Sequence, residues 1–116
     1  MNEANDTAVA VDAAQMSELH DMASHACDLL KAMANEWRLM ILCQLAESEK
    51  TVSELQSLLG LGQSALSQHL AILRREKIVV SRKHAQSVSY SLAGDEATRV
   101  MESLHDVFCG AADSRE

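Results

Sequence analysis

Three cysteines are the side chains in this sequence with the widest chemistry: Cys27, Cys43 and Cys109. A cysteine can fill a gap in a core, bind a metal ion as a thiolate, or react reversibly with an oxidant. Structural disulfides are common in secreted chains, but the N-terminus has no basic segment of the kind that opens a signal peptide. We therefore predict a cytoplasmic protein whose cysteines do not form a disulfide framework. Core packing, metal binding and redox sensing stay open.

Side chains that bind metal ions gather near the last cysteine. His105 and Cys109 are four residues apart, which places them on one face of a helix, and Glu102 lies about one turn earlier. Asp95 lies ten residues before His105 and no second histidine follows at helical spacing, so the set is short of ligands. A metal-sensing protein that uses Glu102, His105 and Cys109 is therefore the alternative interpretation. The sequence predicts no cofactor.

A second group of side chains is suited to hydrogen bonding with a nucleic acid. Over residues 63–77, Leu66, Leu70 and Leu73 fall on one side of a predicted helix. The side chains on the opposite side are small and polar near the N-terminal end of the helix and basic near its C-terminal end. Such groups can contact base edges and phosphates. An ordinary solvated helix shows the same pattern, so the neighbouring segments must decide. The outward-facing residues are Ser64, Ser67, Gln68, Ala71 and Arg75.

A short helix and a tight turn precede this segment. Thr51 and Glu54 have the spacing of a capping box, in which each side chain accepts a hydrogen bond from the other residue's backbone N–H. Gly60 follows where a left-handed residue would end the helix after little more than two turns. Residues 51–77 are thus predicted to form two helices joined by a turn at Leu61-Gly62.

The segment after the second helix alternates with the period of a strand. Val88, Tyr90 and Leu92 alternate with serines, and residues 78–82 supply a matching strand, so residues 78–92 predict a hairpin. Arg82 and Lys83 flank its turn, which spans residues 83–86 and lacks Gly and Pro. A basic hairpin tip beside a polar helix is typical of a wing on the DNA backbone, although surface charges also keep exposed hairpins soluble.

The remaining segments predict three more helices. One runs from Met16 to Met33, one from Trp37 to Ala46 after an Asn35 cap, and one from about Asp95 to Cys109. The middle one is apolar nearly all round and is expected to be the buried centre. The expected fold is mainly α with a small β-hairpin, in the order α-α-α-α-β-β-α, over residues 15–112. Residues 1–14 are expected to be a disordered acidic tail.

Composition sets the outer limits. The chain has 116 residues, no Pro and only four Gly, which fits one domain, and no apolar run is long enough to cross a membrane. The net charge is −7, but residues 62–93 hold five bases and one acid, a local +4 that leaves −11 elsewhere. Affinity for DNA follows the local charge, so the acidic total does not exclude a DNA-binding protein.

The segments Gln63-Ser-Ala-Leu-Ser-Gln-His-Leu70 and Leu73-Arg-Arg-Glu-Lys-Ile-Val-Val80 closely resemble the ArsR-type bacterial repressors, as do Tyr90-Ser-Leu92 and Arg38-Leu-Met-Ile-Leu42. The resemblance covers about residues 29–108. It implies a winged helix-turn-helix that binds double-stranded operator DNA as a homodimer through its first and last helices. Gly62 and the wing tip depart from the family, which often has Ser and Gly there. The DNA-contacting residues that it implies are Gln63, Ser64, Ser67, Gln68, His69, Arg75, Arg82 and Lys83.

The cysteines resemble one branch of that family. Many relatives bind metal through Cys-Val-Cys before the recognition helix, but Thr51-Val52-Ser53 stands here, and hydroxyls are poor ligands for soft metals. Cys43 and Cys109 instead match the persulfide-responsive branch of the SqrR and BigR type. That match implies a repressor released when reactive sulfur species or another thiol oxidant bridge the pair. An enzyme is not expected, because no Cys-His arrangement in the sequence comes with a shaped active-site loop. A DNA-independent interaction module is the other class of protein considered.

Overall fold

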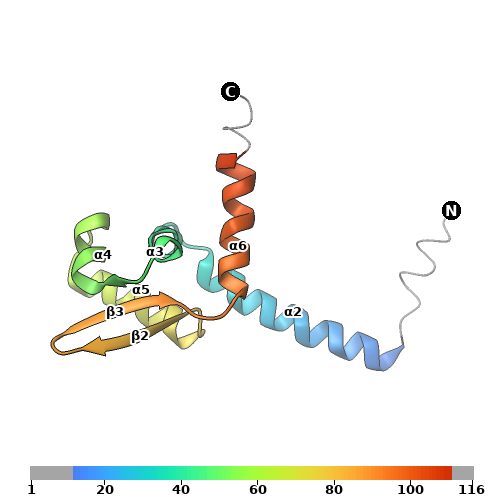
Figure 1. Ribbon diagram of the computed structural model, residues 1–116. Helices are drawn as coiled ribbons and strands as arrows, with labels where there is room; N and C mark the ends of the chain where they lie inside the picture. The colour runs from blue at the N-terminus through green and yellow to red at the C-terminus, as the bar shows by residue number, and fades with distance from the viewer. Residues whose placement is uncertain (1–11, 111–116) are drawn as a thin grey trace.

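The computed structural model describes residues 12–110 (Figure 1), and their arrangement confirms the mainly α fold with a small hairpin. Residues 1–11, most of the expected acidic tail, lie outside the described residues. The first helix begins at Ala13, inside the boundary expected for that tail, because Asp12 and Gln15 form a capping box. The elements are α2 (Ala13–Met33), α3 (Glu36–Glu47), β1 (Lys50–Thr51), α4 (Val52–Leu59), α5 (Gln63–Arg75), β2 (Val79–His84), β3 (Ser87–Leu92), α6 (Glu96–His105) and a π-helical turn, η1 (Asp106–Gly110).

The helix-turn-helix forms where its capping residues predict it. The Thr51 hydroxyl accepts from the Glu54 N–H at 3.1 Å, and the Thr51 N–H donates to the Glu54 carboxylate at 2.7 Å. Gly60 ends α4 with φ +68°, a conformation that costs a glycine little. The recognition helix α5 ends at Arg75, two residues earlier than expected, because Lys77 adopts a left-handed φ of +62°.

The wing belongs to a three-stranded antiparallel sheet in the order β1-β3-β2. The hairpin was predicted, but β1 was not: Lys50 pairs with Tyr90, and Thr51 pairs with Ser89. A two-residue strand is too short to show a period in the sequence. The hairpin turn is also tighter than expected, because β2 continues to His84 and β3 begins at Ser87. Ala85 takes φ +52° there, where the family often has Gly.

The core lies where α3, α4, α5 and the sheet meet. The helix α3, expected to be the buried centre of the domain, contributes Ile41, Leu42 and Leu45 to this core, but Trp37 and Met40 are exposed on its other side. The largest fully buried side chains are Ile41, Leu42, Leu55, Leu66, Leu73, Ile78 and Val79.

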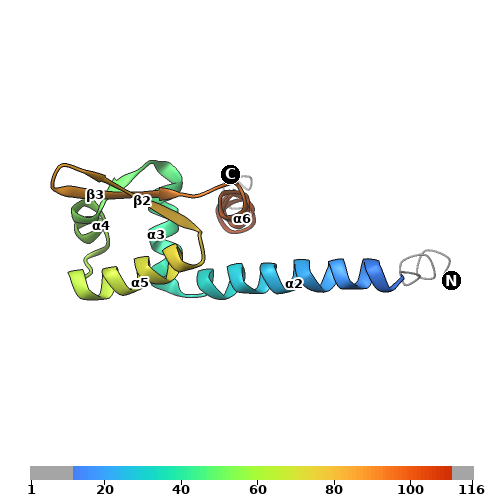
Figure 2. The same ribbon diagram turned by 90° about the horizontal axis from the view of Figure 1, so that it is seen from below.

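Two helices extend away from this core. Figure 2 shows α2 reaching out from the body formed by the other elements, and Figure 1 shows α6 rising beside it. The radius of gyration is 18.3 Å, against about 13 Å for a compact chain of this length. Within residues 12–110, no helix is long and apolar enough to cross a membrane. Apolar side chains left uncovered on these helices and on η1 are Met16, Leu19, Met22, Leu30, Val107 and Phe108.

Candidate DNA-binding surface and thiol pair

The outer face of α5 carries the polar groups that the sequence placed there. Leu66, Leu70 and Leu73 point into the core, so the rotation of the helix is set by burial. The opposite side is open to solvent over the first two turns, where amide and hydroxyl groups are free to approach a base edge. Its exposed residues in that part are Gln63, Ser64, Ser67 and Gln68.

His69 lies elsewhere. It is half-buried, and its Nδ1 lies 3.5 Å from Nη1 of Arg38 in α3, while the Arg38 Nε donates to the Ala32 carbonyl at 2.5 Å. Burial, and then the charge of Arg38, lower the pKa of His69, and the ring faces α3. The expectation that His69 reads bases therefore does not fit its position. Its spacing of three from Leu66 indicates this side of the helix.

The basic side chains differ in how free they are. Arg75 lies beside Glu76, with 3.5 Å between Nε and Oε2. Arg82 pairs with Glu49 at 2.6 Å between Nη2 and Oε1, and Lys83, which is exposed, forms no ion pair within residues 12–110. Lys83 is thus the wing cation most available to a phosphate.

A groove between α5 and the wing contains two residues that the sequence analysis did not select. Arg74 and Tyr90 line an open hollow of about 440 Å³ together with Ser67, Ala71 and Arg75. Ser67, Ala71 and Arg74 recur at spacings of four and three, which could have indicated Arg74. The role of Tyr90 depends on a sheet that approaches α5 only in the folded chain.

Two of the three thiols line one cavity. Cys43 of α3 and Cys109 of η1 line the same cavity, of about 660 Å³, with Leu39, Met101 and Phe108 among the other lining residues. Burial, and then the negative charge of a Cys109 thiolate, raise the pKa of Cys43. Both thiols are exposed, so packing in the core does not describe Cys43.

Cys27 and the candidate metal ligands lie apart from this arrangement. Cys27 is exposed on α2 and is not among the residues that line the cavity. Glu102 and His105 do line it, yet no three His, Cys, Asp or Glu side chains in the described part of the chain are grouped to hold a metal ion. The alternative set of Glu102, His105 and Cys109 therefore does not form a site.

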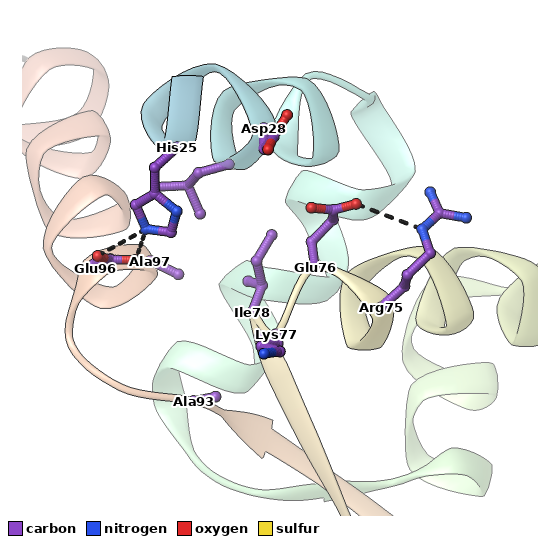
Figure 3. Close-up of a pocket in the computed structure, with 10 residues that line it drawn as sticks. His25, Asp28, Arg75, Glu76, Lys77, Ile78, Ala93, Glu96 and Ala97 are labelled. Carbon is purple, nitrogen blue, oxygen red and sulfur yellow. Dashed lines mark hydrogen bonds and ion pairs between the residues drawn. The ribbon is translucent and has the colours of Figure 1, made fainter. Parts of the chain in front are cut away.

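A smaller cavity, of about 240 Å³, lies where α2, α6 and the end of α5 meet (Figure 3). His25 of α2 approaches both carboxylate oxygens of Glu96 in α6, at 3.0 and 3.1 Å from Nε2. Arg75 and Glu76 line the same cavity from the end of α5. The contact joins exposed side chains of the two projecting helices near the end of the recognition helix.

The sequence is similar to a known family of proteins. Residues 35–81 match the model of the bacterial regulatory proteins of the arsR family. The transcriptional activator HlyU of Vibrio cholerae is 51% identical over 96 residues, which are 83% of this chain and 89% of the relative. The biofilm growth-associated repressor of Agrobacterium fabrum is 42% identical over 87 residues, 75% of this chain and 74% of the relative.

Solved structures of related proteins have a similar fold. Reduced HlyU from Vibrio cholerae has a TM-score of 0.76 and 52% identity, and it covers 79% of this chain and 97% of its own. The transcriptional repressor BigR from Xylella fastidiosa has a TM-score of 0.75 and 34% identity, covering 81% and 96%. These proteins are winged helix-turn-helix transcriptional regulators, not enzymes. With its helix-turn-helix, basic wing and matched relatives, the chain belongs to the ArsR family of DNA-binding transcriptional regulators.

Proposed function

We propose that the chain is a cytoplasmic homodimeric repressor that leaves its operator when Cys43 and Cys109 are bridged. The observation that carries the proposal is that both thiols line one cavity, although 66 positions separate them in the sequence. A reversible link between two cysteines in a reducing compartment is typical of a sensor. The relative from Agrobacterium fabrum is named a repressor, which favours repression as the sign of control.

The chemistry of the bridge balances with a persulfide as the oxidant. A thiolate of the pair attacks the outer sulfur of a donor R–S–SH, forming a protein persulfide and releasing the donor as R–SH. The second thiol then attacks the inner sulfur, forming the disulfide and releasing hydrogen sulfide, which carries the two electrons away. Each further sulfur in the bridge consumes one more donor. Cys109 is the expected first attacker, because it lies in an exposed turn whereas Cys43 has a raised pKa.

A short route leads from the pair to the recognition helix. Cys43 belongs to α3, and α3 packs directly against α5. Arg38 of α3 lies against His69 of α5 at 3.5 Å. A bridge that moves α3 relative to α6 therefore acts on the orientation of α5. Only a difference in DNA affinity between the two states makes this a switch, and about 3 kcal/mol corresponds to roughly a hundredfold release.

The dimer is proposed from the uncovered apolar surface. Six large apolar side chains are exposed on α2 and η1, and exposed apolar surface of this kind is typical of a protein–protein interface. A twofold dimer that uses these elements would present two α5 helices to successive major grooves, about 34 Å apart. The operator is then expected to be pseudo-palindromic double-stranded DNA.

Two substitutions separate reading of sequence from attraction to the backbone. Gln68→Ala should relax the preference among operator variants, because an amide can pair in two places with adenine, at a value of about 1–3 kcal/mol. Lys83→Ala should weaken binding to every duplex alike and flatten the dependence of log K on log salt by about 1. Fluorescence anisotropy titrations at several salt concentrations measure both. An unchanged preference in Gln68→Ala would show that this residue does not read bases.

The sign of control is tested with a reporter gene behind the operator. Addition of a sulfane-sulfur donor should raise reporter output in cells that carry the wild-type chain and leave it unchanged in cells that carry the Cys43→Ser chain. Output that falls in the wild-type cells would indicate an activator, as the relative HlyU is named.

A further inference from the structure

One carboxylate lies against both strands of the wing. Glu49, in the connection between α3 and β1, accepts a hydrogen bond from the Ser89 hydroxyl of β3 and pairs with Arg82 of β2 at 2.6 Å. Arg82 and Ser89 are directly opposite each other in the hairpin. Glu49 therefore contacts the wing at the cross-strand pair that carries one of its two basic side chains nearest the tip.

Contacts of the residues that follow Glu49 fix the backbone beside it. The neighbouring Lys50 donates from Nζ to the Gln44 carbonyl at 3.0 Å and to the Ser48 hydroxyl at 2.9 Å. The backbone of Lys50 and Thr51 is also paired with β3. The Glu49 carboxylate itself accepts a hydrogen bond from Ser89, so part of its side-chain entropy is already lost before it pairs with Arg82, which strengthens the pair relative to a contact between two free side chains.

The surroundings of the carboxylate also favour its charged form. The hydrogen bond from the Ser89 hydroxyl is the largest effect and lowers the pKa of Glu49; burial, next in size, opposes it, and the charge of Arg82 lowers the pKa further. The side chain of Arg82 is 63% exposed, so its guanidinium is accessible to solvent while it is paired. A guanidinium has the same fork geometry towards a carboxylate and a phosphate, and these two acceptors would occupy the same donors.

We propose that Glu49 competes with the DNA backbone for Arg82. The affinity of the wing for DNA is thereby lower than its basic side chains would give without Glu49. This inference rests on the proposed binding of DNA. Because Glu49 neutralises Arg82, the pair adds no net cation to the DNA-facing surface and releases no counterion of its own. Lys83, which has no such acid beside it among the described residues, provides the backbone attraction at the tip.

The test is the affinity of the full-length chain for a mixed-sequence duplex, measured by anisotropy from low to moderate salt. Glu49→Gln removes the charge but keeps an oxygen that can accept from Ser89, so the hairpin is retained. It should bind about fivefold more tightly for each wing that engages DNA, the scale of an exposed ion pair, with a salt slope steeper by about 0.9 per wing. The matched control is Glu47→Gln, which removes the same charge from an exposed side chain whose ion pair, among the described residues, is with Lys50 rather than with the wing.

Arg82→Gln provides a second, independent measurement. The Arg82→Gln, Glu49→Gln double variant removes the pair as a neutral unit, so it should change affinity and salt slope far less than Lys83→Gln does. In the Arg82→Gln background, Glu49→Gln should tighten binding less than it does in the wild-type background, because no guanidinium is released to the phosphate. Melting temperatures show that each variant is folded.

Three results would each overturn the competition: Glu49→Gln binding no tighter than Glu47→Gln, a gain from Glu49→Gln that is undiminished without Arg82, or equal losses in the Arg82→Gln, Glu49→Gln double variant and in Lys83→Gln. Weaker binding by Glu49→Gln would instead assign the carboxylate a supporting role in the wing. A wild-type chain that shows no salt-dependent binding to any duplex would remove the proposed function itself, so the two failures are distinguishable.

Discussion

Cys43→Ser and Cys109→Ser should each stay bound to the operator at a concentration of sulfane-sulfur donor that weakens wild-type binding about a hundredfold. Each variant lacks one end of the bridge, so neither can link α3 to η1. The remaining thiol can still take up sulfur, but a persulfide on one helix does not constrain the other. Operator binding with and without donor measures the effect, and intact-mass spectrometry identifies the bridge in the wild-type chain.

The matched control is Cys27→Ser. Cys27 is exposed on α2 and lies outside the cavity that holds the other two thiols, so this variant should respond as the wild type does. Continued release of the Cys43→Ser, Cys109→Ser double variant would exclude the bridge and return Cys27 or a metal ion to consideration. Release of the double variant that is the same with and without added zinc would then indicate Cys27, and release that depends on zinc would indicate a metal ion.

Met22→Glu should convert the dimer into a monomer and lower operator affinity by about a hundredfold or more. Met22 is 60% exposed in the protomer, so the new carboxylate costs the protomer little, but a twofold interface buries two copies of it without partners. The loss in affinity follows because one recognition helix then binds without the second. Sedimentation velocity at micromolar concentration measures the assembly, and anisotropy measures the affinity.

Ser24→Glu is the control for this substitution. Position 24 is exposed on the opposite side of α2, so the variant adds the same charge without entering the predicted interface. It should remain dimeric. A Met22→Glu chain that sediments as a dimer would place the interface elsewhere.

The elements that the sequence predicted well are those whose signals are local. Thr51, Glu54 and Gly60 determine the ends of α4 through contacts within four residues, and the leucines of α5 determine its rotation. The alternation in the wing was read correctly as a hairpin, but it does not show that Ser89 is buried. The carboxylate of Glu49, 40 positions away, accepts a hydrogen bond from the Ser89 hydroxyl.

The parts of the candidate site that escaped prediction depend on contacts between distant segments. The pairing of Arg82 with Glu49, and the hollow that Arg74 shares with Tyr90, require the sheet to be folded. The exposure of Cys43 has another cause. A helix that is apolar nearly all round indicates burial on every side, but the sequence alone does not show whether one chain or several supply the side chains that cover it.

In the proposed dimer, the reach of α2 beyond the core makes the survival of the protein depend on its own abundance. A helix whose apolar stripe is not covered within residues 12–110 would be stabilised by association, so its stability would rise with the concentration of the chain. At low copy number more of the chains would have α2 uncovered and frayed, and these would be open to proteolysis. Synthesis and survival would then reinforce each other, and a cell could clear the regulator soon after transcription of its gene stops.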